Sequence, residues 1–61
     1  MTRHHRRLLR RLRAVCAPRG IRPTLSRVRA GWCVDVPTVA ACYSPRRVVA
    51  LRTALDTVRA P

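Results

Sequence analysis

Large apolar side chains are scarce in this chain, and their scarcity limits the folds that it can adopt. Its 61 residues include six leucines, eight valines, one isoleucine, one tryptophan and one tyrosine, with no phenylalanine. A chain of this size buries only about 60% of the surface that it exposes when unfolded, so its stability is marginal. We therefore expect one small domain over residues 1–61, whose thin core would gain stability from a dimer contact, a partner or a metal.

The charge is strongly unbalanced. The chain has 14 basic and 2 acidic residues, a formal net charge of +12, and every basic residue is an arginine. The planar guanidinium group binds phosphates through two parallel hydrogen bonds and keeps its charge at every physiological pH. A polyanionic partner is therefore expected, and the candidates are nucleic acid, an acidic protein surface and anionic lipid.

Residues 3–17 have the pattern of an amphipathic helix. Leu8, Leu12 and Cys16 fall at helical spacing on one face, with Leu9 and Val15 beside them. Thr2 is the expected N-cap of this helix. Arginines cover most of the remaining helix surface: Arg3, Arg6, Arg7, Arg10, Arg11 and Arg13.

Residues 18–24 carry two prolines and a glycine, which predicts a loop. Residues 25–36 are ambiguous. Our preferred interpretation is a short helix through residue 30, capped by Thr24 and followed by an extended Trp32-Cys33-Val34. A β-hairpin over 25–36 is the alternative, because Trp32, Val34 and Val36 alternate with polar or small residues. A further short helix is expected over 36–43.

Residues 44–60 predict a long C-terminal helix. Ser44 is its expected cap, Pro45 its first residue, and Val48, Leu51, Leu55 and Val58 recur at helical spacing. Asp56 is spaced to form ion pairs with Arg52 and Arg59. With a basic N-terminal helix, short middle helices and this C-terminal helix, the expected fold class is all-α.

The junction before this helix carries a resemblance to a known motif. Val39-Ala40-Ala41-Cys42-Tyr43 followed by Ser44-Pro45-Arg46-Arg47-Val48 resembles the paired segments of bacterial helix-turn-helix regulators. The resemblance implies a small alanine between two helices and a second helix whose first residues enter the DNA major groove. It also implies that Arg46 and Arg47 contact bases or phosphates.

The sequence gives little support for catalysis or for a metal site. Asp35 and Asp56 are the two acidic residues, and neither is paired with a histidine or a second carboxylate in the pattern of general acid–base catalysis. Cys16, Cys33 and Cys42 lack the close pairing of zinc ligands. We therefore expect no enzyme activity, no cofactor and no metal. Three cysteines, no signal peptide and no membrane span favour a cytoplasmic protein with free thiols.

The expected function is non-catalytic binding of nucleic acid through arginine–phosphate contacts, as in a small accessory or regulatory factor, with DNA favoured over RNA. The alternative is a protein-interaction module, an inhibitor or assembly factor, that docks on an acidic partner surface. A homodimer is compatible with either function. The residues expected to contact nucleic acid are Arg6, Arg7, Arg10, Arg11, Arg13, Arg46 and Arg47.

Overall fold

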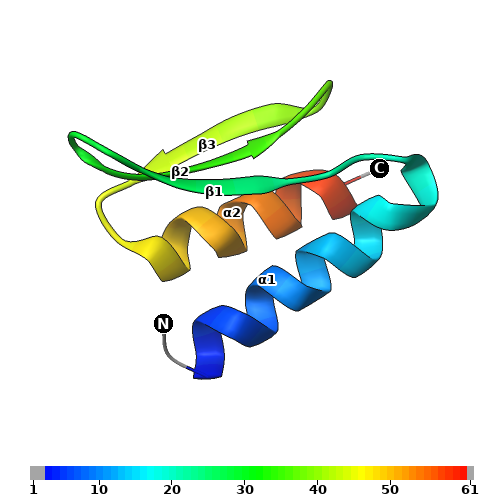
Figure 1. The fold of residues 1–61 in the computed structure, drawn as a ribbon, viewed down its shortest axis with the longest axis horizontal. Helices are drawn as coiled ribbons and strands as arrows, with labels where there is room; N and C mark the ends of the chain where they lie inside the picture. Colours follow the sequence, from blue (N-terminus) through cyan, green and yellow to red (C-terminus); the bar gives the residue numbers. More distant parts are fainter. Residues whose placement is uncertain (1–2, 61) are drawn as a thin grey trace.

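The structure is a computed structural model that describes residues 3–60, so the predicted cap Thr2 lies outside the described residues. The strands form one antiparallel sheet in the order β1-β2-β3. Both helices lie on the same side of this sheet (Figure 1). The elements are helix α1 (Arg3–Cys16), a 3-10 turn η1 (Ala17–Arg19), strands β1 (Thr24–Val28), β2 (Gly31–Val36) and β3 (Ala40–Ser44), and helix α2 (Arg47–Arg59).

The all-α prediction is wrong, because the middle of the chain forms a sheet. The fold is α+β, with β1 and β2 making the hairpin that was the alternative for residues 25–36. Leu25 pairs with Val34, and Val28 pairs with Gly31 across a two-residue turn. The predicted short helix over 36–43 is replaced by a turn and by β3, which pairs antiparallel with β2.

The sheet forms because it covers the apolar face of α2. Val34 and Val36 on β2 are buried, whereas Asp35 between them is exposed. This alternation places one face of β2 against α2, which packs on β2 and β3. Short helices over the same residues would point these valines in several directions around each helix. The core consists of Leu8, Leu12, Cys16, Val34, Val36, Cys42, Ala50, Leu51, Ala54, Leu55 and Val58.

Helix α2 begins later than the sequence indicates. Ser44 is the last residue of β3, where it pairs with Trp32, and is not a helix cap. Its Oγ accepts a hydrogen bond from the backbone N–H of Arg46 at 3.2 Å. Arg46 occupies the N-cap position in an extended conformation and makes no capping hydrogen bond with its side chain. Because Ser44 pairs within the sheet, it does not cap the helix, and α2 begins at Arg47 instead of Pro45.

Helix α1 ends at Cys16, one residue before its predicted end, and is attached to the rest of the fold through α2. No Cα atom of α1 lies within 8 Å of a strand Cα atom. The helix stands on the outer side of α2, away from the sheet (Figure 1). Most of its circumference is therefore open to a partner. No helix within residues 3–60 is both long and apolar enough to cross a membrane.

Candidate nucleic-acid interface

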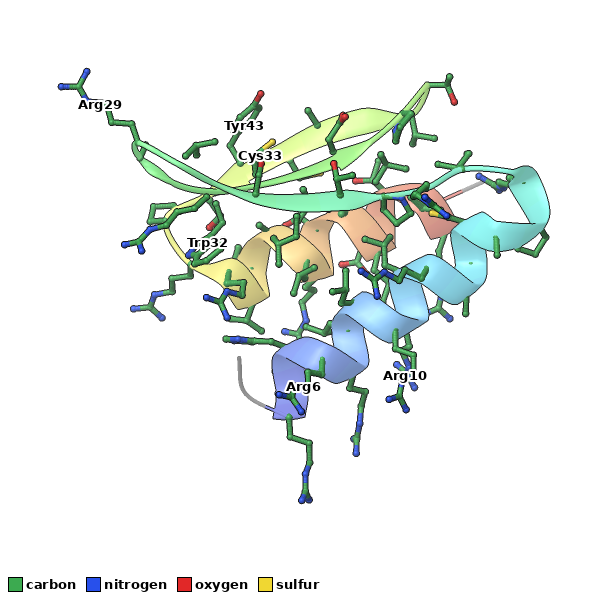
Figure 2. The ribbon with its side chains drawn as sticks, in the orientation of Figure 1. Arg6, Arg10, Arg29, Trp32, Cys33 and Tyr43 are labelled. Atoms are coloured by element: carbon green, nitrogen blue, oxygen red, sulfur yellow. The ribbon has the colours of Figure 1, made fainter. Side chains whose placement is uncertain are left out.

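The solvent-facing side of α1 carries a dense row of arginines. Leu8, Leu12 and Cys16 are buried because their spacing of four residues keeps them on the side that faces α2. Arg6 and Arg10 extend in the opposite direction, away from the sheet (Figure 2). We call the exposed arginines of this helix the α1 arginine face, and they are Arg3, Arg6, Arg7, Arg10, Arg11 and Arg13.

These charges are not balanced within the described part of the chain. Between residues 3 and 60, no arginine forms an ion pair with Asp35 or Asp56. The two ion pairs that the spacing of Asp56 predicts with Arg52 and Arg59 are therefore not formed. Like charges one turn apart, such as Arg6 and Arg10, repel each other, and arginines in the first turn oppose the helix dipole. A bound polyanion would relieve both penalties.

A second basic cluster surrounds Trp32. The guanidinium carbon of Arg47 lies 3.9 Å from the centre of the indole ring, and that of Arg27 lies 5.9 Å from it. Arg27 is the cross-strand partner of Trp32, whereas Arg47 comes from the first turn of α2. Trp32 is half-buried and packs against the edge of the core. Such cation–π contacts fix the position of a guanidinium group and leave the N–H groups at its edge available to an anion.

Arg47 is thus used partly for packing. Its side chain is half-buried, and its Nε atom is buried without a hydrogen-bond partner in the described structure. Arg46, its neighbour, is exposed. Of the two arginines expected to contact nucleic acid at the start of α2, Arg46 is therefore the fully accessible one.

His5 connects α1 to this cluster. Partial burial lowers the pKa of His5 from its usual 6.5, and the positive charges of Arg47 and His4 lower the pKa further. The N-terminal ends of α1 and α2 lie on the same side of the molecule (Figure 1), and there the charge of Arg47 acts on His5. The neutral form of His5 is therefore favoured where two basic elements meet.

This shift predicts that acidification destabilises the fold. Because the pKa of His5 is lower in the folded state, the unfolded state binds a proton first as the pH falls through about 6.5. The free energy of unfolding should therefore decrease below that pH, until His5 is protonated in the folded state as well. Urea unfolding at a series of pH values measures the effect. His5→Gln should remove this component of the decrease and His4→Gln should keep most of it, whereas identical profiles for both variants would contradict the assignment.

Three basic elements lie at one end of the molecule, with the start of α2 between the other two (Figure 1). The start of α1, the start of α2 and the β1–β2 turn lie along the same side (Figure 1). Arg29 projects from that turn into solvent (Figure 2). We call the arginines of the β1–β2 hairpin and of the start of α2 the basic end, and they are Arg27, Arg29, Arg46 and Arg47.

Arg27 and Arg29 were missed as candidates, because the preferred helical interpretation separated them from the rest. The signal that would have found them is the strand alternation of Trp32, Val34 and Val36. Once these residues form a strand, a tight turn before Gly31 places Arg27 opposite Trp32. The hairpin therefore adds two basic side chains to the candidate interface.

The outer face of the sheet has a different character. Cys33 and Tyr43 lie on this face, on the side away from the helices (Figure 2). Tyr43 is 70% exposed, and a hydrogen bond with the Cys33 thiol raises the pKa of its phenol. Asp35 is also exposed on this face. Positive charge is therefore concentrated on α1 and at the basic end.

The described residues do not form the helix-turn-helix motif that the sequence resembles. The segment that would form the first helix of the motif lies in the β2–β3 turn and in β3. A strand cannot present the helix pair that positions a recognition helix in that motif. Any contact that Arg46 makes with nucleic acid must therefore come from a different arrangement.

Metal and thiol chemistry have no organised site in the described region. Within residues 3–60, no three His, Cys, Asp or Glu side chains gather closely enough to hold a metal ion. Cys16, Cys33 and Cys42 are all buried and free of disulfide bonds. They pack as small apolar side chains.

The chain matches no protein-family model, no curated protein sequence and no solved structure at a significant level. Its own residues and geometry are the basis for assigning its function.

Proposed function

We propose that this protein binds double-stranded nucleic acid, DNA in preference to RNA, through arginine–phosphate contacts and without catalysis. The observation that supports this function is the α1 arginine face, whose six exposed arginines have no ion-pair partner in the described chain. Phosphate contacts of this kind provide affinity and register, and they carry no sequence information directly. Binding is therefore expected to tolerate many sequences.

The shape of α1 favours DNA. A helix with its side chains is about 10–12 Å wide, and the major groove of B-form DNA is about 12 Å wide. The 14 residues of α1 span about 21 Å, a distance along which a duplex presents many phosphates. The major groove of A-form RNA is too narrow and deep for such a helix. Because α1 stands on the outer side of α2, its arginine face can enter a groove before the rest of the domain meets the duplex.

The basic end offers a second contact. Arg29 and Arg46 are exposed on the side of the molecule where α1 begins. Arg46 also lies at the N-terminus of α2, where the helix dipole favours an anion. We assign Arg46 to a phosphate that flanks the groove occupied by α1. Arg29 extends in the opposite direction to Arg6 and Arg10 (Figure 2) and is assigned no contact there.

The test is a fluorescence-anisotropy titration of duplex DNA and hairpin RNA at increasing salt concentration. If about five phosphates are neutralised, the slope of log K against log salt on DNA should be about −4.5, because each phosphate contributes about −0.9. Arg10→Gln combined with Arg11→Gln removes two contacts, so the slope should fall to about −2.7. Weaker binding to the RNA hairpin is expected at each salt concentration.

The matched control is Arg52→Gln combined with Arg59→Gln. This variant loses the same charge from exposed positions on α2, outside the proposed interface. Its slope should remain near that of the unmodified protein. Equal slopes for the two double variants would mean that binding follows net charge alone, and negligible binding at low salt would overturn the proposed function.

A further inference from the structure

A groove of about 940 Å³ lies between α1 and the segment that leads into β1. Its apolar lining includes Leu9 from α1, Ile21 from the connecting loop and Leu25 from β1. All three side chains are half-buried at the edge of the core. The groove is large for so small a domain, since pockets for small-molecule ligands typically measure about 300–1,000 Å³.

The groove exists because α1 packs on α2 and does not reach the sheet. No Cα atom of α1 comes within 8 Å of a strand Cα atom, so the backbones of α1 and β1 leave a space between them. Leu9, Ile21 and Leu25 therefore remain partly in contact with water. Covering them would extend a core that is otherwise thin.

All the charged side chains that line the groove are positive. Arg13 and Arg22 are part of its lining, and both are exposed without an ion-pair partner in the described chain. Neither of the two aspartates lines the groove. A ligand that fits must bring both apolar groups for the floor and negative charge for the two arginines. A phosphodiester backbone supplies only the charge, whereas an acidic peptide with apolar side chains supplies both.

The adjoining strand favours an extended peptide. β1 is an edge strand, paired with β2 on one side and with no strand of residues 3–60 on the other. Thr24 and Leu25 of β1 line the groove. The free edge of β1 offers backbone donors and acceptors to an added strand, as in other complexes that extend a sheet. Alternate side chains of such a strand would point toward α1 and fill the groove.

We propose that the groove between α1 and β1 binds an extended acidic peptide segment of a partner protein, in which apolar and acidic side chains alternate. The segment pairs with the free edge of β1, and the apolar side chains on its α1 side cover Leu9 and Leu25. Carboxylates at the end of the paired stretch, where the strand alternation no longer holds, contact Arg13 and Arg22. This site is distinct from the one proposed for the duplex, which uses the outer side of α1. Arg13 is the one residue that belongs to both.

The test compares two fluorescent peptides of equal length and charge, one alternating valine with glutamate and one alternating serine with glutamate. Each valine that enters the groove removes apolar surface from water, so the valine peptide should bind about tenfold more tightly or better. Amide chemical-shift changes from the valine peptide should concentrate in residues 20–28. Equal affinities for the two peptides would overturn the proposal, because both would then bind by charge alone.

Two tryptophan substitutions, at Ala17 and at Ala14, distinguish peptide binding in the groove from binding elsewhere on α1. Ala17 is exposed and lines the groove, whereas Ala14 is exposed and does not. Ala17→Trp should fill the groove and weaken binding of the valine peptide about tenfold, through the loss of valine burial. Ala14→Trp should leave peptide affinity unchanged, and equal effects of the two substitutions would place the peptide elsewhere. Duplex binding should survive Ala17→Trp, so the failure of one proposal is distinguishable from the failure of the other.

Discussion

Gly31→Ala is expected to unfold most of the protein at room temperature. Gly31 has a φ of 143°, a conformation that residues with a side chain rarely adopt. A Cβ atom at this position would lie 2.5 Å from both the Cα of Pro45 and the carbonyl oxygen of Ser44. Both obstacles are backbone atoms and cannot rotate away. Backbone strain and overpacking together should cost about 3 kcal/mol or more, which is comparable with the whole stability of a domain this small.

The measurement is urea unfolding followed by circular dichroism, with Gly20→Ala as the matched control. Gly20 also has a positive φ, 69°, but nothing lies within 4 Å of a Cβ atom built on it. Gly20→Ala introduces backbone strain but no steric clash, so the free energy of unfolding should decrease by only about 1 kcal/mol. Similar losses for the two alanine variants would show that the close approach at Gly31 is absent in solution.

The effect of Gly31 reaches the candidate interface. This residue begins β2 directly after the turn that carries Arg29, and it touches the point where β3 leads into α2. The close approach therefore holds the β1–β2 turn near the start of α2, where Arg46 lies. Even a partly folded Gly31→Ala variant should lose the alignment of these two arginines.

The two helices could be predicted from the sequence because their patterns are local. Leu8, Leu12 and Cys16 define one face of α1 without reference to any other segment, and Leu51, Leu55 and Val58 do the same for α2. Helical spacing is enough to predict such elements. The start of α2 was placed too early, because the pairing of Ser44 with Trp32 is a long-range contact that local capping preferences do not report.

The sheet could not be settled by local patterns. Leu25, Val28 and Trp32 fit one face of a helix, while Trp32, Val34 and Val36 fit one face of a strand. The choice depends on α2, whose buried surface includes the small residues Ala50 and Ala54. Small side chains allow a sheet to approach a helix closely, and that fit exists only when all three strands are in place.

The candidate site, like the fold, could be predicted from the sequence only where it depends on local patterns. The arginines of α1 could be predicted as one surface from helical spacing alone. The basic end required the hairpin, because Arg27 and Arg29 are brought to it by the pairing of β1 with β2. The groove required knowledge that α1 packs on α2 and leaves β1 uncovered, which no local pattern contains.

Leu12→Ala should release α1 from the domain and weaken duplex binding, without abolishing it. Leu12 is fully buried, and α1 has α2 as its main neighbour. Removing such a side chain costs about 2 kcal/mol, less than the whole stability of the domain, through lost burial and the cavity that remains. The isolated helix has little stability of its own, because it is short and its first turn carries basic residues and no acidic ones. Hydrogen exchange of the α1 amides should therefore accelerate more than exchange in the sheet.

Leu9→Ala is the matched control, since Leu9 lies on the same helix but is only half-buried at the groove. It should cost about 1 kcal/mol and leave duplex binding nearly intact, because fewer buried methyl groups are lost. Duplex DNA should also slow exchange in α1 of the Leu12→Ala variant, since a ligand that binds only the folded state shifts the equilibrium toward it. If α1 of this variant stayed protected without DNA, packing on α2 would not be what holds the helix. If DNA gave no protection, α1 would not be the element that contacts the duplex.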